Sequence, residues 1–166
     1  MASNLLTARR VLDEFKKCGI THIVWLSDHY DSAVMHGMMK NEPGITVVPV
    51  CREGEAIPIA AGLLLGGKKP VVLHQSSGLF EAGDSVRGLA LDLKLPLLLV
   101  MGYRGWSRDK PITDSAAVFL EPMLNAWGIK HYLVESDDDA GKISQAYQEA
   151  NETSRTIAVL IGKEYS

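Results

Sequence analysis

Six short runs of aliphatic and β-branched residues recur along the chain, and longer segments with helical spacing of apolar residues lie between them. Several runs are apolar at every position, which is typical of strands covered on both faces. The alternation predicts an α/β fold: a three-layer, doubly wound, mainly parallel sheet of about six strands. The predicted strands are His22–Leu26, Ile45–Val50, Val71–His74, Leu95–Met101, His131–Val134 and Thr156–Ile161.

Two segments with helical spacing end at a glycine, a residue that commonly terminates helices. Leu5–Lys17 is followed by Gly19, and Val118–Trp127 is followed by Gly128. The acidic run Asp137–Asp139 is predicted to begin a helix, because carboxylates are favourable at the positive end of the helix dipole. A metal site in this run is the less favoured alternative.

Composition narrows the class of protein. The 166 residues fit one domain spanning residues 1–166, and a hydrophobic share of 46% argues against disorder. A net charge of -3 makes a nucleic-acid partner unlikely on electrostatic grounds. The two cysteines have no metal-ligand spacing, and no apolar run is long enough to span a bilayer. We therefore expect a cytoplasmic protein with no membrane partner and no metal site of its own.

Common nucleotide and hydrolase motifs are absent. The chain has no G-x-G-x-x-G after the first strand, no G-x-x-x-x-G-K-[ST], no G-x-S-x-G and no H-E-x-x-H. These absences disfavour a P-loop nucleotidase, an ordinary dinucleotide enzyme, a serine hydrolase and a zinc protease.

Polar loops follow three successive predicted strands, at 27–30, 52–55 and 75–78. In a parallel sheet these loops meet at one edge, where α/β proteins keep their chemistry. The polar segment Tyr103–Ala116 follows a fourth strand in the same way. Each loop also has an ordinary interpretation, since Asp28 and Glu53 can cap helices and Ser76 can be a turn residue.

Four blocks in residues 52–105 resemble the pyrimidine-binding domain of thiamine-diphosphate-dependent decarboxylases. The resemblance is to sulfopyruvate decarboxylase alpha subunits and to the N-terminal half of phosphonopyruvate decarboxylases. The family patterns are R-E-x-E-x-x-x-I-x-A-G, G-K-K-P, M-Q-N-S-G-L-G-N and an apolar strand ending in Y-R-G or W-R-G. The counterparts here are Arg52–Gly62, Gly67–Pro70, His74–Leu79 and Gly102–Gly105.

The resemblance implies a role for Glu53, which matches the glutamate that hydrogen-bonds N1′ of the cofactor's aminopyrimidine ring. A carboxyl group there stabilises the protonated ring that proton removal from the thiazolium requires. Glu55 does not match that position and is interpreted as a charge in the first turn of a helix. The resemblance also places Gln75, Ser76, Ser77, Gly78 and Leu79 among the cofactor-binding residues.

In this family the diphosphate and its Mg2+ are held by a second domain, which contains G-D-G and a downstream asparagine. The chain has Gly83-Asp84-Ser85 without the second glycine or the downstream partner. The resemblance therefore implies that thiamine diphosphate and Mg2+ are completed by a beta subunit, in an alpha–beta heterotetramer.

The substrate residues are inferred from charge. Two-ended anionic 2-oxo acids require cationic groups or N–H donors, which Arg104 and Arg108 provide. Asp28 stands where many family members place a polar residue facing the substrate, and His29 lies on the same loop; both are assigned catalytic roles beside Glu53. His74 replaces an apolar residue of the family and is interpreted as a satisfied core histidine.

Two positions depart from the family pattern, because Phe80 and Glu81 replace a small residue and an amide. Phe80 is expected to narrow or re-line the pocket, and Glu81 to repel an anionic substrate if it faces inward. The preferred hypothesis is the pyrimidine-binding subunit of a 2-oxo acid decarboxylase. A two-subunit thiamine-dependent carboligase or lyase, and a non-catalytic α/β assembly module, remain alternatives.

Overall fold

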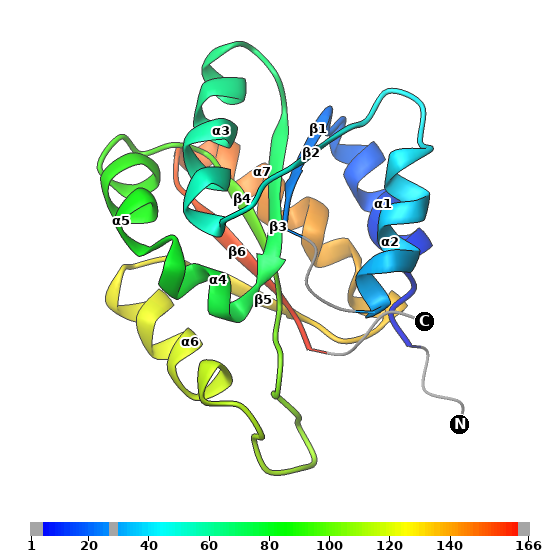
Figure 1. The fold of residues 1–166 in the computed structure, drawn as a ribbon, viewed down its shortest axis with the longest axis vertical. Helices are drawn as coiled ribbons and strands as arrows, with labels where there is room; N and C mark the ends of the chain where they lie inside the picture. The colour runs from blue at the N-terminus through cyan, green and yellow to red at the C-terminus, as the bar shows by residue number, and fades with distance from the viewer. Residues whose placement is uncertain (1–4, 27–29, 163–166) are drawn as a thin grey trace.

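A parallel sheet forms the centre of the computed structural model, which describes residues 5–26 and 30–162. Within those ranges the sheet has six strands in the order β2-β1-β3-β4-β6-β5, all paired in parallel (Figure 1). The strands are β1 His22–Trp25, β2 Thr46–Pro49, β3 Pro70–Gln75, β4 Leu98–Gly102, β5 His131–Val134 and β6 Ile157–Ile161. The predicted α/β fold is confirmed.

Helices cover both faces of the sheet, as predicted (Figure 1). One face is covered by α1 Ala8–Cys18, α2 Tyr30–Lys40 and α7 Gly141–Thr153, with the short η2 Asp137–Asp139 leading into α7. The other face is covered by α3 Glu53–Leu65, α4 Ser76–Glu81, α5 Gly83–Ser85, η1 Val86–Leu91 and α6 Ser115–Ala126. None of the helices that the structure describes has the length and hydropathy of a membrane span.

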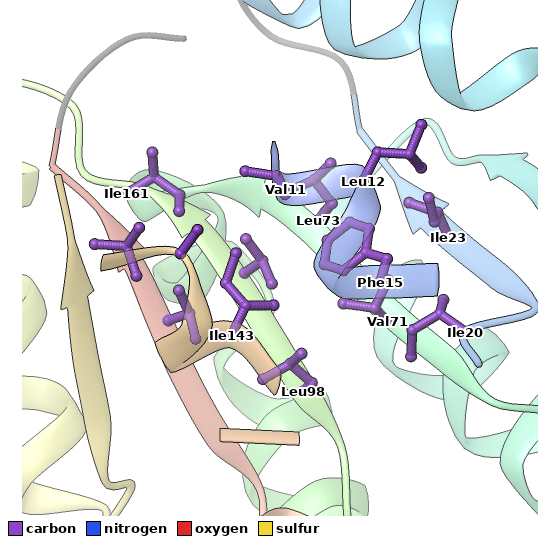
Figure 2. Packing of buried hydrophobic residues seen from close by; sticks show 14 of the residues in the cluster. Val11, Leu12, Phe15, Ile20, Ile23, Val71, Leu73, Leu98, Ile143 and Ile161 are labelled. Carbon is purple, nitrogen blue, oxygen red and sulfur yellow. The ribbon is translucent and has the colours of Figure 1, made fainter. Parts of the chain in front are cut away.

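Alternation along the strands explains why their sequences are apolar throughout. In β4, Leu98 and Val100 are buried on the side of α1 and α7, whereas Leu99 and Met101 are buried on the side of α3 and α6. Figure 2 shows the first of these two cores, in which Phe15 of α1 packs among side chains of the sheet. Each residue of such a strand therefore contributes to one core or the other.

The predicted helix ends agree with the structure. Gly19 and Gly128 both have left-handed backbone, with φ of 69° and 67°, which glycine adopts without a steric penalty. The acidic run begins a helical segment, and the carboxylate of Asp137 accepts the backbone N–H of Thr7 over 2.8 Å. The Asp139 carboxylate binds Lys142 at 2.6 Å. These carboxylates therefore have structural partners.

One strand begins later than predicted. The apolar run from Leu95 predicts a strand from that residue, but β4 starts at Leu98. Pro96 has no N–H to donate to a neighbouring strand, and the N–H of Leu97 bonds back to the carbonyl of Leu95 over 2.9 Å. A tight turn thus precedes the strand.

Candidate active site

The first turn of α3 carries the two carboxylates of the R-E-G-E segment. Arg52 is the N-cap residue, and Glu53 is the first helical residue and half-buried, so the interpretation of Glu53 as the cap is wrong. Glu55 is exposed, and its carboxylate accepts the backbone N–H of Cys51 over 3.2 Å. Glu55 is therefore a helix-start charge, as predicted, which leaves Glu53 as the carboxylate that faces other elements.

The segment after β3 holds this first turn in place through Gly54. The carboxylate of Glu81 accepts the N–H of Gly54 and also binds the Arg52 guanidinium, at 2.8 Å from Nε and 2.6 Å from Nη2. The Ser85 hydroxyl donates to the Gly54 carbonyl over 3.0 Å. That carbonyl lacks its usual helical donor because residue 58 is proline. Glu81 and Ser85 together fix the backbone next to Glu53.

Gly78 of α4 provides the surface against which Glu53 packs. A Cβ at residue 78 would lie 2.5 Å from Cγ and 2.9 Å from Oε1 of Glu53, and 2.8 Å from Nδ1 of His74. A carbon atom at those distances would overlap all three atoms. Glycine is therefore required here for space, and it brings the Glu53 carboxylate and the His74 imidazole to the same point.

Three buried polar atoms without a hydrogen-bond partner lie in the adjoining turn from β3 to α4. They are Nε2 of His74, Oε1 of Gln75 and Oγ of Ser76. Nδ1 of His74 lies 2.6 Å from the carbonyl oxygen of Gln75, so Nδ1 carries the proton. Burial lowers the pKa of His74, which keeps the imidazole neutral and leaves Nε2 as an acceptor. Unpaired buried polar atoms are costly, so this cluster indicates a binding site.

His74 is thus only half explained by the sequence. It is a core histidine, with 4% of its surface exposed, but it is not a satisfied one. Strand alternation places it on the same side of the sheet as α3, whereas Gln75 belongs to the side of α1. The polar atoms therefore reach the carboxyl end of β3 from both faces.

The side chains of α4 differ in what they can contribute to the site. Leu79 is fully buried in the core below α3, so its side chain is part of that core. Ser77 is exposed and lines a groove of about 650 Å³ between α4 and α6, together with Phe80 and Phe119. Phe80 lines this groove on the α6 side of α4, and its effect on the cofactor pocket stays a prediction. Glu81, by contrast, binds Gly54 and Arg52 rather than facing an open pocket.

The two candidate substrate arginines are ion-paired. Nε of Arg104 lies 3.0 Å from the carboxylate of Asp114, and Arg108 binds Glu135. Arg104 follows β4, whose last residue pairs with Gln75, so it lies near the His74 cluster in the sheet. Arg108 is tied to the loop after β5, and two strands separate β5 from β3. The structure therefore brings Arg104 closer than Arg108 to the cluster.

Asp28 and His29 fall outside the described residues. The loop that contains them follows β1, and β1 and β3 are neighbours in the sheet. The chain leaves β1 toward β2 on one side and returns to β3 on the other, which is the arrangement in which α/β sheets bind ligands. Glu53 and the His74 cluster lie at this edge of the sheet.

Sequence reasoning missed the residues that hold Glu53 in place. Ser85 and Glu81 act on Gly54 from 31 and 27 residues away, and such contacts leave no local pattern. Pro58 was the one available signal, because a proline inside a helix predicts a carbonyl in need of another donor. What results is a half-buried carboxylate beside a neutral imidazole and unpaired acceptors, which can hold and position a proton on a ligand.

Comparison with known proteins identifies relatives of this chain. The chain is 34% identical over 133 residues to the sulfopyruvate decarboxylase subunit alpha of Methanothermobacter thermautotrophicus, covering 77% of this chain and 79% of that protein. It is 28% identical over 107 residues to the subunit of the same name from Methanocaldococcus jannaschii, covering 64% of this chain. That match spans 63% of the relative, which is just under two thirds. No family model matches the chain.

Solved structures share the fold. A benzoylformate decarboxylase from Polynucleobacter necessarius superposes with a TM-score of 0.73 at 19% identity, over 100% of this chain and 31% of that one. A putative thiamin diphosphate-dependent enzyme from Mycobacterium smegmatis gives 0.69 at 19% identity, over 98% of this chain and 32% of that one. The resemblance inferred from the four sequence blocks is confirmed.

Proposed function

The chain belongs to the sulfopyruvate decarboxylase alpha-subunit family, and we propose that it is the pyrimidine-binding subunit of a two-subunit, thiamine-diphosphate-dependent 2-oxo acid decarboxylase. The observation that carries the proposal is the packing of Glu53 on Gly78 beside the unpaired polar atoms of His74, Gln75 and Ser76. These residues fit an aminopyrimidine ring, which offers ring nitrogens and an amine to such groups.

Thiamine diphosphate, when bound, supplies the carbon that attacks a keto group, and its thiazolium ring takes up the electron pair released when carbon dioxide leaves. Glu53 would hold a proton between its carboxyl group and the aminopyrimidine ring. The buried surroundings on the side of α4 strengthen that hydrogen bond relative to water. Glu81 and Ser85 would keep the carboxyl group in position, and Gly78 would let the side chain lie flat on α4.

The assignment of the remaining residues is part of the same proposal. Gln75, Ser76 and Ser77 line the cofactor site, with Leu79 contributing through its backbone. Asp28 and His29, on the loop after β1, are assigned to act on the substrate, and Arg104 would bind its anionic group by exchanging its partner Asp114 for the substrate. Arg108 assists only if it leaves Glu135, with which it pairs in this structure.

The partner in this proposal is a beta subunit that holds the diphosphate and Mg2+, in a cytoplasmic heterotetramer in which residues 1–166 form one domain. Support comes from the relatives, which are named as alpha subunits.

Glu81, one of the two departures from the family pattern, has partners within the chain and so does not argue against an anionic 2-oxo acid. The carboligase alternative loses the part of its support that rested on Glu81.

The test is the Glu53→Gln variant, reconstituted with its partner subunit. We expect exchange of the cofactor's C2 proton and carbon dioxide release to fall on the order of a hundredfold or more, because amide cannot transfer the proton. Asp84→Asn is the matched control, since it removes an exposed carboxylate from α5 and should leave both rates unchanged. Unimpaired exchange in Glu53→Gln overturns the proposed role.

A further inference from the structure

A groove of about 650 Å³ lies between α4 and α6, two helices that lie side by side (Figure 1). Its size is that of a small-molecule site, and such sites are lined mainly by apolar side chains with a few polar groups. The groove fits that description, because its three largest side chains are Phe80 of α4 and Phe119 and Met123 of α6.

The groove borders the residues proposed to hold the cofactor. Ser77 lines it and is the neighbour of Gly78, on which Glu53 packs. Phe80 follows three residues after Ser77, so both side chains lie on the same side of α4. A ligand that reacts next to the pyrimidine ring can therefore extend along α4 into the groove.

A second connection runs through Asp114, which also lines the groove. Asp114 is the N-cap of α6, and its Oδ1 accepts the N–H of Ala116 over 2.9 Å. Its Oδ2 lies 3.0 Å from Nε of Arg104, the residue proposed to bind the anionic group of the substrate. The groove thus borders both the cofactor residues and the partner of the substrate arginine.

The charges of the groove favour a ligand with one negative group. Among the described residues that line it, none is basic and Asp114 is acidic. Arg108, the second candidate substrate arginine, is not among them and binds Glu135. A second anionic group inside the groove would have no cationic partner there and would be repelled by the Asp114 carboxylate.

The aromatic side chains of the groove favour an apolar ligand. Phe119 is 59% exposed, so a ligand that covers its ring removes apolar surface from water. Phe80 is half-buried and stands where the family pattern has a small residue, so it adds apolar surface that the pattern lacks. This departure from the family and the charges of the groove point to the same kind of ligand.

We propose that the groove receives the side chain of the substrate, and that the substrate is a 2-oxo acid with a single negative charge and an apolar side chain such as a phenyl group. Arg104 would bind the carboxylate, and the apolar side chain would lie against Phe80 and Phe119, which determine specificity. The inference rests on the proposed function, because it names the substrate class of that reaction.

The first test measures binding without turnover. 3-Phenylpropanoate and 3-sulfopropanoate have no keto group and cannot be decarboxylated, so their affinities report on the site alone. The protein is the complex with the partner subunit, loaded with thiamine diphosphate and Mg2+. We expect calorimetry to give a dissociation constant at least tenfold lower for 3-phenylpropanoate, because only its side chain gains from burial.

Phe119→Ala should remove that preference. Val118→Ala is the matched control, because Val118 is the neighbouring residue on α6, is 49% exposed and is not among the residues that line the groove. It should keep the preference of the wild type. Equal or weaker binding of 3-phenylpropanoate by the wild type, or a preference that Phe119→Ala leaves intact, overturns the proposal.

The second test compares carbon dioxide release from pyruvate, phenylpyruvate and sulfopyruvate. The methyl group of pyruvate is too short to fill the groove, so Phe119→Ala should lower kcat/KM for phenylpyruvate at least tenfold and leave that for pyruvate unchanged. Equal losses on both would mean that Phe119 acts in folding or assembly, and would overturn the proposal. If the wild type turns over none of the three but keeps its binding preference, the proposed decarboxylation is wrong, whereas the groove remains a site for an apolar carboxylate.

Asp114→Asn tests the charge argument separately. Asparagine can still cap α6 through its amide oxygen, but it carries no charge. The affinity for 3-sulfopropanoate should rise several-fold more than that for 3-phenylpropanoate, because only the former has a second negative group. Asp92→Asn, which removes an exposed carboxylate that pairs with Arg87, should change neither affinity. An equal gain for both ligands in Asp114→Asn would contradict the preference for a single negative charge.

Discussion

The side chain of Glu53 lies on Gly78 so closely that a Cβ at residue 78 would stand 2.5 Å from its Cγ. Gly78→Ala should therefore displace the carboxylate or the start of α4. Overpacking of this kind typically destabilises a protein by about 1–3 kcal/mol. Chemical denaturation measures that loss, and the variant assembled with its partner subunit should show weaker stabilisation by thiamine diphosphate with Mg2+ than the wild type does.

The control for this variant is Gly88→Ala in η1, where a Cβ meets no atom within 4 Å. Alanine there should be neutral or stabilise the protein by up to about 1 kcal/mol, because glycine is a poor helix former. Equal stability of Gly78→Ala and Gly88→Ala would contradict the close contact with Glu53.

The Glu81 carboxylate should make the stability of the protein depend on pH. Hydrogen bonds from the N–H of Gly54, the larger cause, and from the Arg52 guanidinium lower the pKa of Glu81 below its ordinary value of 4.5. A lowered pKa in the folded state gives stability that is present above pH 4.5 and is lost as the pH falls through the folded-state pKa. Glu81→Gln should melt at a lower temperature than the wild type at neutral pH, and the difference should shrink below pH 4.5.

A pH-independent difference between wild type and Glu81→Gln, followed by thermal melts from pH 7 to pH 3, would show that the charge of Glu81 does not matter. The expected shrinkage follows from the ionised carboxylate accepting the Gly54 N–H more strongly than an amide or a protonated carboxyl group does.

His74 should produce a second acid-dependent effect at higher pH. Burial lowers the pKa of its imidazole in the folded protein from the ordinary value of 6.5. Below pH 6.5 the unfolded chain therefore binds a proton at His74 more readily than the folded chain does. Stability contributed by the neutral form is therefore present above pH 6.5 and falls as the pH drops below it. His74→Met removes this titration, and its melting temperature should fall less than that of the wild type between pH 7 and pH 5.

The same variant also removes Nε2, a buried acceptor with no partner. An unsatisfied buried polar atom costs about 1–3 kcal/mol, so His74→Met should be as stable as the wild type or more stable at pH 7. A large loss of stability at pH 7 would mean that the hydrogen bond from Nδ1 to the Gln75 carbonyl outweighs the cost of the unpaired Nε2.

Ser85 and Pro58 should show energetic coupling. Ser85→Ala removes the hydroxyl that donates to the Gly54 carbonyl, at an expected cost of about 1 kcal/mol. Pro58→Ala restores the N–H that the helix lacks, so the Ser85→Ala change should cost less in that background. Denaturant unfolding of the four proteins of the cycle measures the difference. Additive losses would mean that the N–H of residue 58 does not replace the Ser85 hydroxyl as the donor to the Gly54 carbonyl.

The fold follows from local sequence features because each strand faces two cores. Leu98–Met101 are apolar at every position since alternate residues enter different cores, and this pattern is visible without any long-range information. Gly19 ends α1 for an equally local reason, its left-handed backbone. The predicted start of β4 was wrong because the leucines around Pro96 favour a strand, whereas Pro96 itself has no N–H to donate to a neighbouring strand.

The site was predictable only in part. Glu53 and the residues 75–79 were assigned to the candidate site through their resemblance to a family, and Glu55 to a helix start through its place in the sequence. The attachment of Gly54 to Glu81 and Ser85 depends on how α4 and α5 fold back onto α3. Pro58 indicates that the Gly54 carbonyl needs another donor, but not which residue supplies it. The unpaired Nε2 of His74 likewise depends on three-dimensional packing rather than on neighbours in the chain.

The position of β6 between β4 and β5 has a consequence for biosynthesis. Strands β1 to β4 can pair with one another as the chain leaves the ribosome, but among the described strands β5 borders only β6. Residues 131–134 therefore wait for residues 157–161 to emerge, with the edge of β4 open in the meantime. An open strand edge is prone to aggregate, so slow translation between β5 and β6 should lower the yield of folded protein.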